Sequence, residues 1–327
     1  MENLSQMKTM IRQKNRMKTV VIATLLLLLA AQESRAQYDA MFTQYMHNEM
    51  FINPAYTGSK EALSVTLLDR QQWMGLAGRP ITRTLSVNGP LFNDKMGLGI
   101  SLMNDQLGVI KRNLVYLSYA YRIKTSKKGT LAFGLMGGLH FQNVNLSDVT
   151  TIDPGDPAFM ADINNLATPN VGFGMYYYTG SFFTGLSIPR MIDDGLVMSS
   201  SGDVLKHLVV RPEKFHYYFT VGNAFTITPD FMLKPQVMLK AVLNSPVQMD
   251  LNLSALFFNR FWLGTSYRSL ADVSVIAGLQ VTPQFLISYS YDYQLTELQQ
   301  FTSGSHEIVL SYLFSFKGQK IVSPRYF

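Results

Sequence analysis

The chain has no cysteine, few charged residues and, beyond its N-terminus, no long hydrophobic run. The lack of cysteine excludes disulfides and thiolate metal sites. Charged residues make up 15% of the chain, against about 25% in ordinary soluble domains. Without a further stretch long enough for a membrane helix, the rest of the chain could cross a bilayer only as a closed barrel. Lipid leaves unpaired backbone groups unsatisfied.

The N-terminus predicts a secretory signal peptide over residues 1–36. Basic residues precede the apolar run Val20–Ala31, and Ser34-Arg35-Ala36 places small residues where a signal peptidase reads them. A retained signal anchor is the alternative, but the run is short for a span of about 20 residues. Met17 is an alternative start. Removal of this segment lowers the net charge from +6 to near +2, so the basic pI implies no nucleic-acid partner.

Fourteen later segments alternate apolar with polar or small residues. The clearest are Val247–Ala255 and Phe285–Gln294. Strand side chains point to opposite faces with period two. A soluble sandwich shares this pattern, but apolar faces rich in Phe and Tyr opposite Gly, Ser, Asn and Gln favour a membrane barrel with a hydrated interior. The predicted strands are residues 62–70, 81–88, 95–103, 112–123, 130–144, 169–178, 181–188, 214–226, 231–243, 247–258, 261–268, 271–281, 284–294 and 305–316.

The connections between these segments predict an orientation. Every second junction is a tight turn, such as Thr228-Pro229-Asp230, whereas the intervening connections include the two longest, 145–168 and 189–213. Bacterial barrels carry short periplasmic turns and longer extracellular loops. We therefore predict an all-β transmembrane antiparallel β-barrel over 61–316, in the bacterial outer membrane. Both termini are periplasmic, and a periplasmic tail covers 317–327.

Glycine and proline occur inside several predicted strands. Glycines such as Gly97, Gly99, Gly134 and Gly174 permit strong coiling and close approach of an inner segment. Pro235 lacks a donor for the strand ladder, so a bulge or a shifted strand boundary is expected there.

Charged residues predicted to face the lumen gather toward the loop ends of the later strands. They could form a selectivity ring or a docking surface for a guest peptide. Ion pairs within the wall explain them more simply. These residues are Lys240, Asp250, Arg268, Asp272, Asp292 and Glu307.

Nothing in the sequence supports catalysis, a metal or a cofactor. The five histidines show no metal-ligand spacing, and Ser305 and His306, as neighbours in a strand, point to opposite faces. Asp153-Pro154-Gly155-Asp156-Pro157 could bind calcium weakly, although turn chemistry accounts for it better. Aromatic tracts such as Tyr176-Tyr177-Tyr178 could stack sugars, but a membrane interface belt explains them more simply.

The segment Gln37–Lys60 does not fit a plain porin. It is neither alternating nor of low complexity, and it contains several aromatic and apolar residues, including Phe42, Phe51 and Tyr56. A free periplasmic linker needs no such residues. The segment therefore either fills the barrel lumen as a plug or docks on a periplasmic partner. The plug is slightly favoured, and the two are compatible.

This segment also carries a resemblance. Gln44–Asn48 followed by Phe51–Gly58 resembles the start of mature PorP/SprF proteins of Bacteroidota, and Arg70–Gly75 with Gly78–Thr82 resembles that family's second signature. Tyr38-Asp39 replaces the family's usual acidic-Pro pair. The candidate partner-binding or plug residues taken from these motifs are Gln44, Tyr45, Phe51, Asn53, Pro54, Tyr56, Gly58, Arg70, Trp73, Gly75 and Pro80.

The resemblance implies a non-enzymatic component of the type IX secretion or gliding machinery. It would bind or surface-anchor a secreted protein, such as an adhesin with a C-terminal sorting domain, and could contact periplasmic components of the secretion apparatus as well as outer-membrane lipid. The long loops would meet the cargo. The alternatives are a passive channel or small-molecule transporter and, third, an outer-membrane lipid hydrolase.

Overall fold

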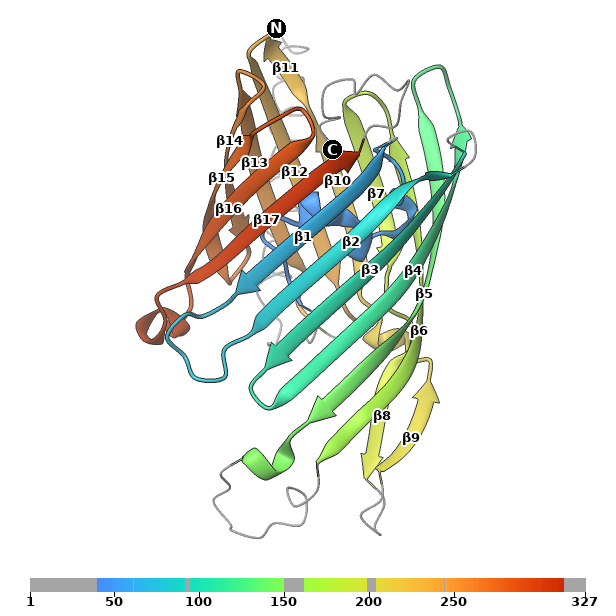
Figure 1. Cartoon of the computed structure of the whole chain (residues 1–327), viewed down its shortest axis with the longest axis vertical. Helices are drawn as coiled ribbons and strands as arrows, with labels where there is room; N and C mark the ends of the chain where they lie inside the picture. Colours follow the sequence, from blue (N-terminus) through green and yellow to red (C-terminus); the bar gives the residue numbers. More distant parts are fainter. Residues whose placement is uncertain are drawn as a thin grey trace, which may run out of the picture.

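The chain forms a closed antiparallel β-barrel, seen here in a computed structural model (Figure 1). The structure describes residues 40–60, 62–91, 95–149, 162–198, 204–243 and 245–314. The predicted signal peptide, the predicted tail 317–327 and the Asp153–Pro157 turn lie outside these residues. No helix of the described part of the chain is long and apolar enough to cross a membrane.

Most of the described residues belong to one continuous sheet. Each strand is antiparallel to its neighbours, and β1 pairs with β17. The barrel strands are β1 (Leu63–Gln71), β2 (Ile81–Leu91), β3 (Met96–Leu107), β4 (Ile110–Lys124), β5 (Thr130–Val144), β6 (Ile163–Tyr178), β7 (Phe182–Ile188), β10 (Tyr217–Asn223), β11 (Phe225–Thr228), β12 (Phe231–Ala241), β13 (Gln248–Phe257), β14 (Phe261–Arg268), β15 (Asp272–Gln280), β16 (Phe285–Gln294) and β17 (Ser305–Phe314).

The wall has fourteen strand positions within the described residues, as predicted. β10 and β11 both pair with β12 and are two parts of one position, and the pairing of β10 with β7 and β12 closes the cylinder. The predicted continuous strand 214–226 is therefore interrupted, at Ala224. The interruption lies opposite Pro235, because β12 pairs with β10 as far as Gln236 and with β11 from Leu233.

Pro235 itself sits in a regular ladder, paired with Leu253 of β13. The expected bulge within this strand is therefore wrong. The irregularity falls on the neighbouring strand, which breaks where Pro235 has no N–H to offer it.

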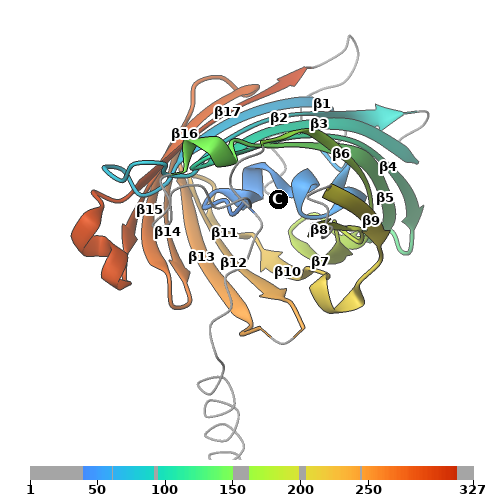
Figure 2. The ribbon, with the colours of Figure 1, turned by 90° about the horizontal axis from the view of Figure 1, so that it is seen from below.

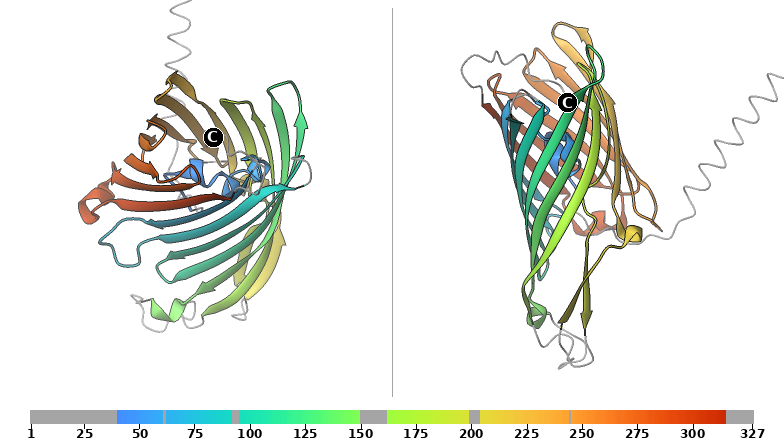
Figure 3. Two further views of the ribbon diagram at one scale, coloured as in Figure 1. Left: turned by 45° about the horizontal axis from the view of Figure 1, so that its top comes forward. Right: turned by 90° about the vertical axis from the view of Figure 1, so that its right-hand side faces the viewer.

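The end of the barrel with the long connections, called here the loop end, carries two features that the sequence did not predict. β6 begins at Ile163 rather than at residue 169, and a separate hairpin forms within the connection after β7. This hairpin, β8 (Asp193–Met198) and β9 (Val204–Val209), projects past the rim beside β6 (Figures 1 and 3). The short 3-10 turns η4 (Leu146–Asp148), η6 (Pro212–Lys214) and η7 (Glu297–Phe301) also lie in connections at this end.

The strands place apolar residues outward and polar residues inward. Leu117, Leu135 and Val275 are more than half exposed on the outer surface, whereas Ser274, Ser288 and Ser290 are buried on the inner face. This is the reverse of a soluble fold and suits a wall surrounded by lipid. The alternation that predicted the strands therefore also predicted which face meets the membrane.

Residues 40–60, called here the inner segment, lie inside the barrel (Figure 2). They form three 3-10 turns, η1 (Tyr45–His47), η2 (Glu49–Phe51) and η3 (Pro54–Tyr56). Asn53 caps η3 by accepting a hydrogen bond from Ala55 N at 2.9 Å, and Pro54 occupies the first position of the turn, where its missing N–H costs nothing. Most of the segment is buried against the inner wall.

Candidate functional site

The inner segment is held near its start by a carboxylate of the last strand. Glu307 of β17 accepts hydrogen bonds from the backbone N–H groups of Thr43, at 3.0 Å, and Gln44, at 2.7 Å. The side-chain amide of Gln44 donates to the Glu307 carbonyl at 3.2 Å. Hydrogen bonds to an ionised acceptor are among the stronger ones in proteins, so this contact fixes the segment against β17.

Arg70 completes the same cluster from β1. Its guanidinium lies 2.7 Å from Asp292 of β16 and 3.0 Å from Glu307, and it donates to the Thr43 hydroxyl at 2.8 Å. That hydroxyl donates in turn to Asp292 at 2.8 Å. The three charged side chains have no exposed surface. One arginine therefore pairs with two carboxylates that also bind the inner segment.

A second arginine repeats this arrangement on the neighbouring wall. Arg268 of β14 lies 3.1 Å from Asp250 of β13 and 3.3 Å from Asp272 of β15. It also donates to the carbonyl of Phe42 at 2.9 Å. Both arginine clusters therefore reach across the wall and also hold the first residues of the inner segment.

The structure thus brings five of the six predicted lumenal charges into two ion-pair clusters. Asp292 and Glu307 share Arg70, and Asp250 and Asp272 share Arg268. Lys240 lies apart, with its ammonium 5.7 Å from the centre of the Tyr218 ring, within range of a cation–π contact. The alternation of side chains along each strand predicted that these residues face the lumen, but it did not predict which residues they pair with.

The far end of the inner segment is bound by other strands. The Asn53 side chain donates to the Met175 carbonyl of β6 at 2.9 Å, and Ser187 of β7 donates to the Ile52 carbonyl at 2.7 Å. Arg122 of β4 donates to the Thr57 carbonyl at 2.9 Å. Arg122 was not among the predicted site residues, although the alternation of β4 places it inward.

Gly58, near the end of the inner segment, has a left-handed backbone conformation, with φ of +72°. Its N–H donates to the Asn88 side chain of β2 at 3.0 Å, and a Cβ at this position would lie 2.8 Å from the carbonyl oxygen of Gly89. Both the backbone angle and the lack of space require glycine here.

Four strand glycines form a socket for residues 53–57, and the socket glycines are Gly97, Gly134, Gly174 and Gly185. A Cβ at Gly134 would lie 2.1 Å from Ala55 N, and one at Gly97 would lie 2.1 Å from the Thr57 carbonyl oxygen. A Cβ at Gly174 would lie 2.0 Å from the Asn53 side-chain oxygen. The backbones of β3, β5, β6 and β7 thus approach the inner segment more closely than any other residue permits.

Aromatic side chains line this socket. The rings of Tyr56 and Tyr176 meet edge to face with centroids 5.6 Å apart, and Tyr176 also contacts Tyr178 and Phe183. Tyr176 and Tyr178 are buried. Assigning the whole tract 176–178 to a membrane belt was therefore wrong, because the two outer tyrosines of the three face the lumen.

Glu49 lies on η2 of the inner segment, not on a barrel strand, and is buried. Burial raises the pKa of its carboxyl above the usual range of a glutamate, against the opposing effect of the positive charges of Lys234 and Lys60.

The Arg70–Thr82 hairpin signature has a different place. Trp73 and Gly75 both have positive φ, at 52° and 100°. Trp73 N donates to the Ser305 hydroxyl at 3.1 Å, and Met74 N donates to the Gly304 carbonyl at 2.8 Å. The β1–β2 turn, which ends at Pro80, is thus bonded to the β16–β17 turn at the loop end. Within the described part of the chain, Arg70 is the residue of this signature that hydrogen-bonds to the inner segment.

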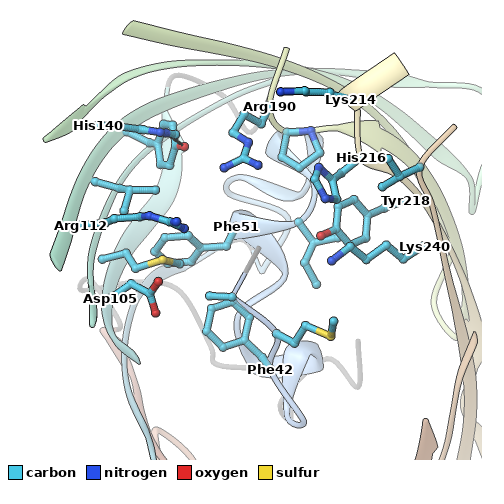
Figure 4. A pocket seen from close by; sticks show the side chains of 18 of the residues that line it. Phe42, Phe51, Asp105, Arg112, His140, Arg190, Lys214, His216, Tyr218 and Lys240 are labelled. Carbon is cyan, nitrogen blue, oxygen red and sulfur yellow. Dashed lines mark hydrogen bonds between the residues drawn. The ribbon is translucent and has the colours of Figure 1, made fainter. Parts of the chain in front are cut away.

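A cavity of about 790 Å³ lies between the inner segment and the loop end (Figure 4). Phe42 and Phe51 of the inner segment point into it. Arg112 and His140 line one side, and His216 and Lys240 line the other. A cavity of this size is in the range of ligand sites.

The described residues contain no group of His, Cys, Asp and Glu that could hold a metal ion. Ser305 and His306 do not act together: His306 contacts the Tyr289 hydroxyl at 2.6 Å, whereas the Ser305 hydroxyl accepts from Trp73 N. The lumenal residues described above position the inner segment through ion pairs and hydrogen bonds.

These features define the chain as an outer-membrane β-barrel that holds its own N-terminal segment in the lumen. A family model described as type IX secretion system membrane protein PorP/SprF matches residues 34–312. The chain belongs to this family and is a membrane component of type IX secretion in the outer membrane.

Solved structures of similar outline include transporters, channels and porins of low sequence identity. The Ralstonia pickettii toluene transporter TbuX is 10% identical, with a TM-score of 0.49 over 82% of this chain and 93% of that one. The monoaromatic hydrocarbon channel CymD is 13% identical, with a TM-score of 0.48 over 86% and 95%. The KdgM porin is 10% identical, with a TM-score of 0.38 over 77% and 99%. No curated protein matches the sequence.

Proposed function

We propose that this barrel is a non-enzymatic docking component that binds or surface-anchors secreted proteins, such as adhesins, at the outer membrane. The inner segment acts as a plug. Cargo meets the barrel from the loop end, and periplasmic secretion components meet it from the other side. Membership in the PorP/SprF family supports the secretion role.

The observation that carries this proposal is the bonding of the inner segment along its length. Glu307 and Arg268 hold its start, and Arg122 and the socket glycines hold its end. A passive channel needs an open lumen, whereas these contacts fix a buried chain segment inside the barrel. A segment bonded in this way serves a binding barrel better than a pore.

The cargo role is tested by isolating the barrel from native membranes in mild detergent and identifying every co-purifying protein. We expect at least one secreted protein with a C-terminal sorting domain, together with its loss from the cell surface when the barrel gene is deleted. Unchanged surface display after deletion would contradict the proposal. The matched control is the same isolation with an unrelated outer-membrane barrel.

The plug role is tested by conductance in planar bilayers. We expect the intact barrel to be silent, and a variant without residues 40–58 to form stable pores, because the deleted residues fill the lumen. The heat-dependent gel shift of folded barrels confirms that the variant still folds. Large stable pores from the intact protein would instead favour the passive channel, the function that the loop-end cavity could otherwise serve.

A further inference from the structure

The loop-end cavity has an apolar floor. Phe42 and Phe51 of the inner segment form its base, and Met103, Met136 and Met238 contribute from three strands of the wall. Methionine side chains adapt to irregular apolar partners because they are unbranched and flexible. The floor therefore suits apolar side chains of varied shape rather than one rigid ligand.

The rim of the cavity is rich in cations. Arg112 and Lys240 lie on opposite sides of it, and Arg190 and Lys214 lie near each other between them (Figure 4). Three carboxylates also line the cavity, those of Asp105, Glu213 and Asp250. Two buried histidines, His140 and His216, also line the cavity. Four cations against three carboxylates leave a net positive charge around the cavity, which favours an anionic guest.

The wall beside the cavity offers an open strand edge. β6 pairs with β5 from Ile163 onward, but β7 pairs with β6 only from Phe173. The Val171 carbonyl accepts from Met191 N at 3.1 Å. Beyond it, among the described residues, no strand pairs with this edge. Because N–H and C=O groups alternate sides along a strand, Ala167 and the Pro169 carbonyl share the edge of Val171.

We propose that this cavity binds an extended peptide segment that carries both acidic and apolar side chains. The segment adds to the open edge of β6 by main-chain hydrogen bonds at Ala167 and Pro169. Its apolar side chains lie on the methionine and phenylalanine floor, and its carboxylates lie among Arg112, Arg190 and Lys214. The inference rests on the proposed function, since the peptide belongs to a secreted partner.

Binding is tested with the purified full-length barrel in detergent micelles and a fluorescein-labelled twelve-residue peptide of alternating Glu, Leu, Asp and Phe. A second peptide carries Lys in place of every acidic residue. We expect the acidic peptide to bind at least about tenfold more tightly by fluorescence anisotropy, with protein-free micelles as the blank. Equal binding of the two peptides would overturn the proposal.

Two substitutions on adjacent residues of β4 give a matched pair. Arg112 lines the cavity, whereas Lys111 is exposed, and the two side chains point to opposite faces. Arg112→Glu should weaken the acidic peptide at least about tenfold and strengthen the lysine peptide, and Lys111→Glu should change neither. A heat-dependent gel shift confirms that both variants fold. If the two variants bind the acidic peptide alike, the proposal is wrong.

The strand edge is tested by cross-linking. Since the protein has no cysteine, Ala167→Cys gives one thiol for a bromoacetyl-labelled acidic peptide, and Lys111→Cys is the control. Cross-linking at 167 alone supports the proposal. If dodecanoate displaces the peptide and no cross-link forms at residue 167, the cavity is a site for anionic amphiphiles, and the proposal of a peptide site is wrong.

The failure of this inference and that of the proposed function are distinguishable. If peptide binding depends on Arg112 but deletion of the gene leaves surface display intact, the peptide site stands and the proposed cargo role is wrong. If deletion of the gene abolishes surface display but the barrel binds the two peptides equally, the proposed cargo role stands and the peptide site is wrong.

Discussion

Replacing Gly134 by valine is expected to release the inner segment from its socket. A Cβ at this position would lie 2.1 Å from Ala55 N and 2.3 Å from the Pro54 carbonyl carbon, both backbone atoms that cannot move aside singly. Overpacking of this kind costs about 1–3 kcal/mol, and the loss of neighbouring hydrogen bonds adds to it. Accessibility of the segment should therefore rise at least about tenfold, since 1.4 kcal/mol is a factor of ten.

The measurement uses a single thiol in the inner segment. Ser59 is buried, and cysteine differs from serine by a single atom, so Ser59→Cys is a mild change in a protein without cysteine. Maleimide labelling of this thiol should accelerate in the Gly134→Val background. Gly137 of the same strand has nothing within 4 Å of a Cβ, so Gly137→Val should leave the rate unchanged. Equal rates in the two backgrounds would mean that the socket does not hold the segment.

Replacing Arg70 by methionine is expected to destabilise the barrel severely. The change leaves Asp292 and Glu307 without the cation that lies within 3.0 Å of both, at a site with no exposed surface. Removal of one partner from a buried ion pair costs about 3–5 kcal/mol. The free energy of unfolding, measured by urea titration in lipid vesicles, should fall by this amount.

A surface ion pair of similar geometry provides the control. Arg83 lies 2.8 Å from Asp69, with side chains 60% and 38% exposed, and exposed pairs contribute only about 0–1 kcal/mol. Arg83→Met should therefore cost far less than Arg70→Met. In the triple variant Arg70→Met, Asp292→Asn, Glu307→Gln, no charge is left unpaired, and part of the stability should return. Equal costs for the two single variants would contradict the role of the buried cluster.

The strands could be predicted from the sequence because their signal is local. Alternation with period two identified all fourteen strand positions and the side that meets lipid. It missed β8 and β9, since Asp193–Met198 and Val204–Val209 do not alternate as the barrel strands do. It also predicted a continuous strand across Ala224, because the break there arises from Pro235 on the neighbouring strand.

The site could be predicted only in part, because its contacts are distant in sequence. The alternation along the strands predicted that Asp292 and Glu307 face the lumen. Their pairing with Arg70 could not be predicted, because it depends on the strand register around the whole barrel. The glycine socket had a weaker signal: glycines within strands suggested close approach of an inner segment, without showing which residues approach. Tyr176 was misassigned because an aromatic residue suits either a lipid interface or a lumenal contact.

The position of Glu307 has a consequence for the order of folding. Its strand is the last of the barrel, Arg70 is on the first, and the two strands join to complete the cylinder. The same carboxylate binds Thr43 and Gln44, which precede both strands in the chain. The seam between the first and last strands thus carries a carboxylate that gains two backbone donors only when the N-terminal residues are inside, so a barrel that closes empty leaves Glu307 without them.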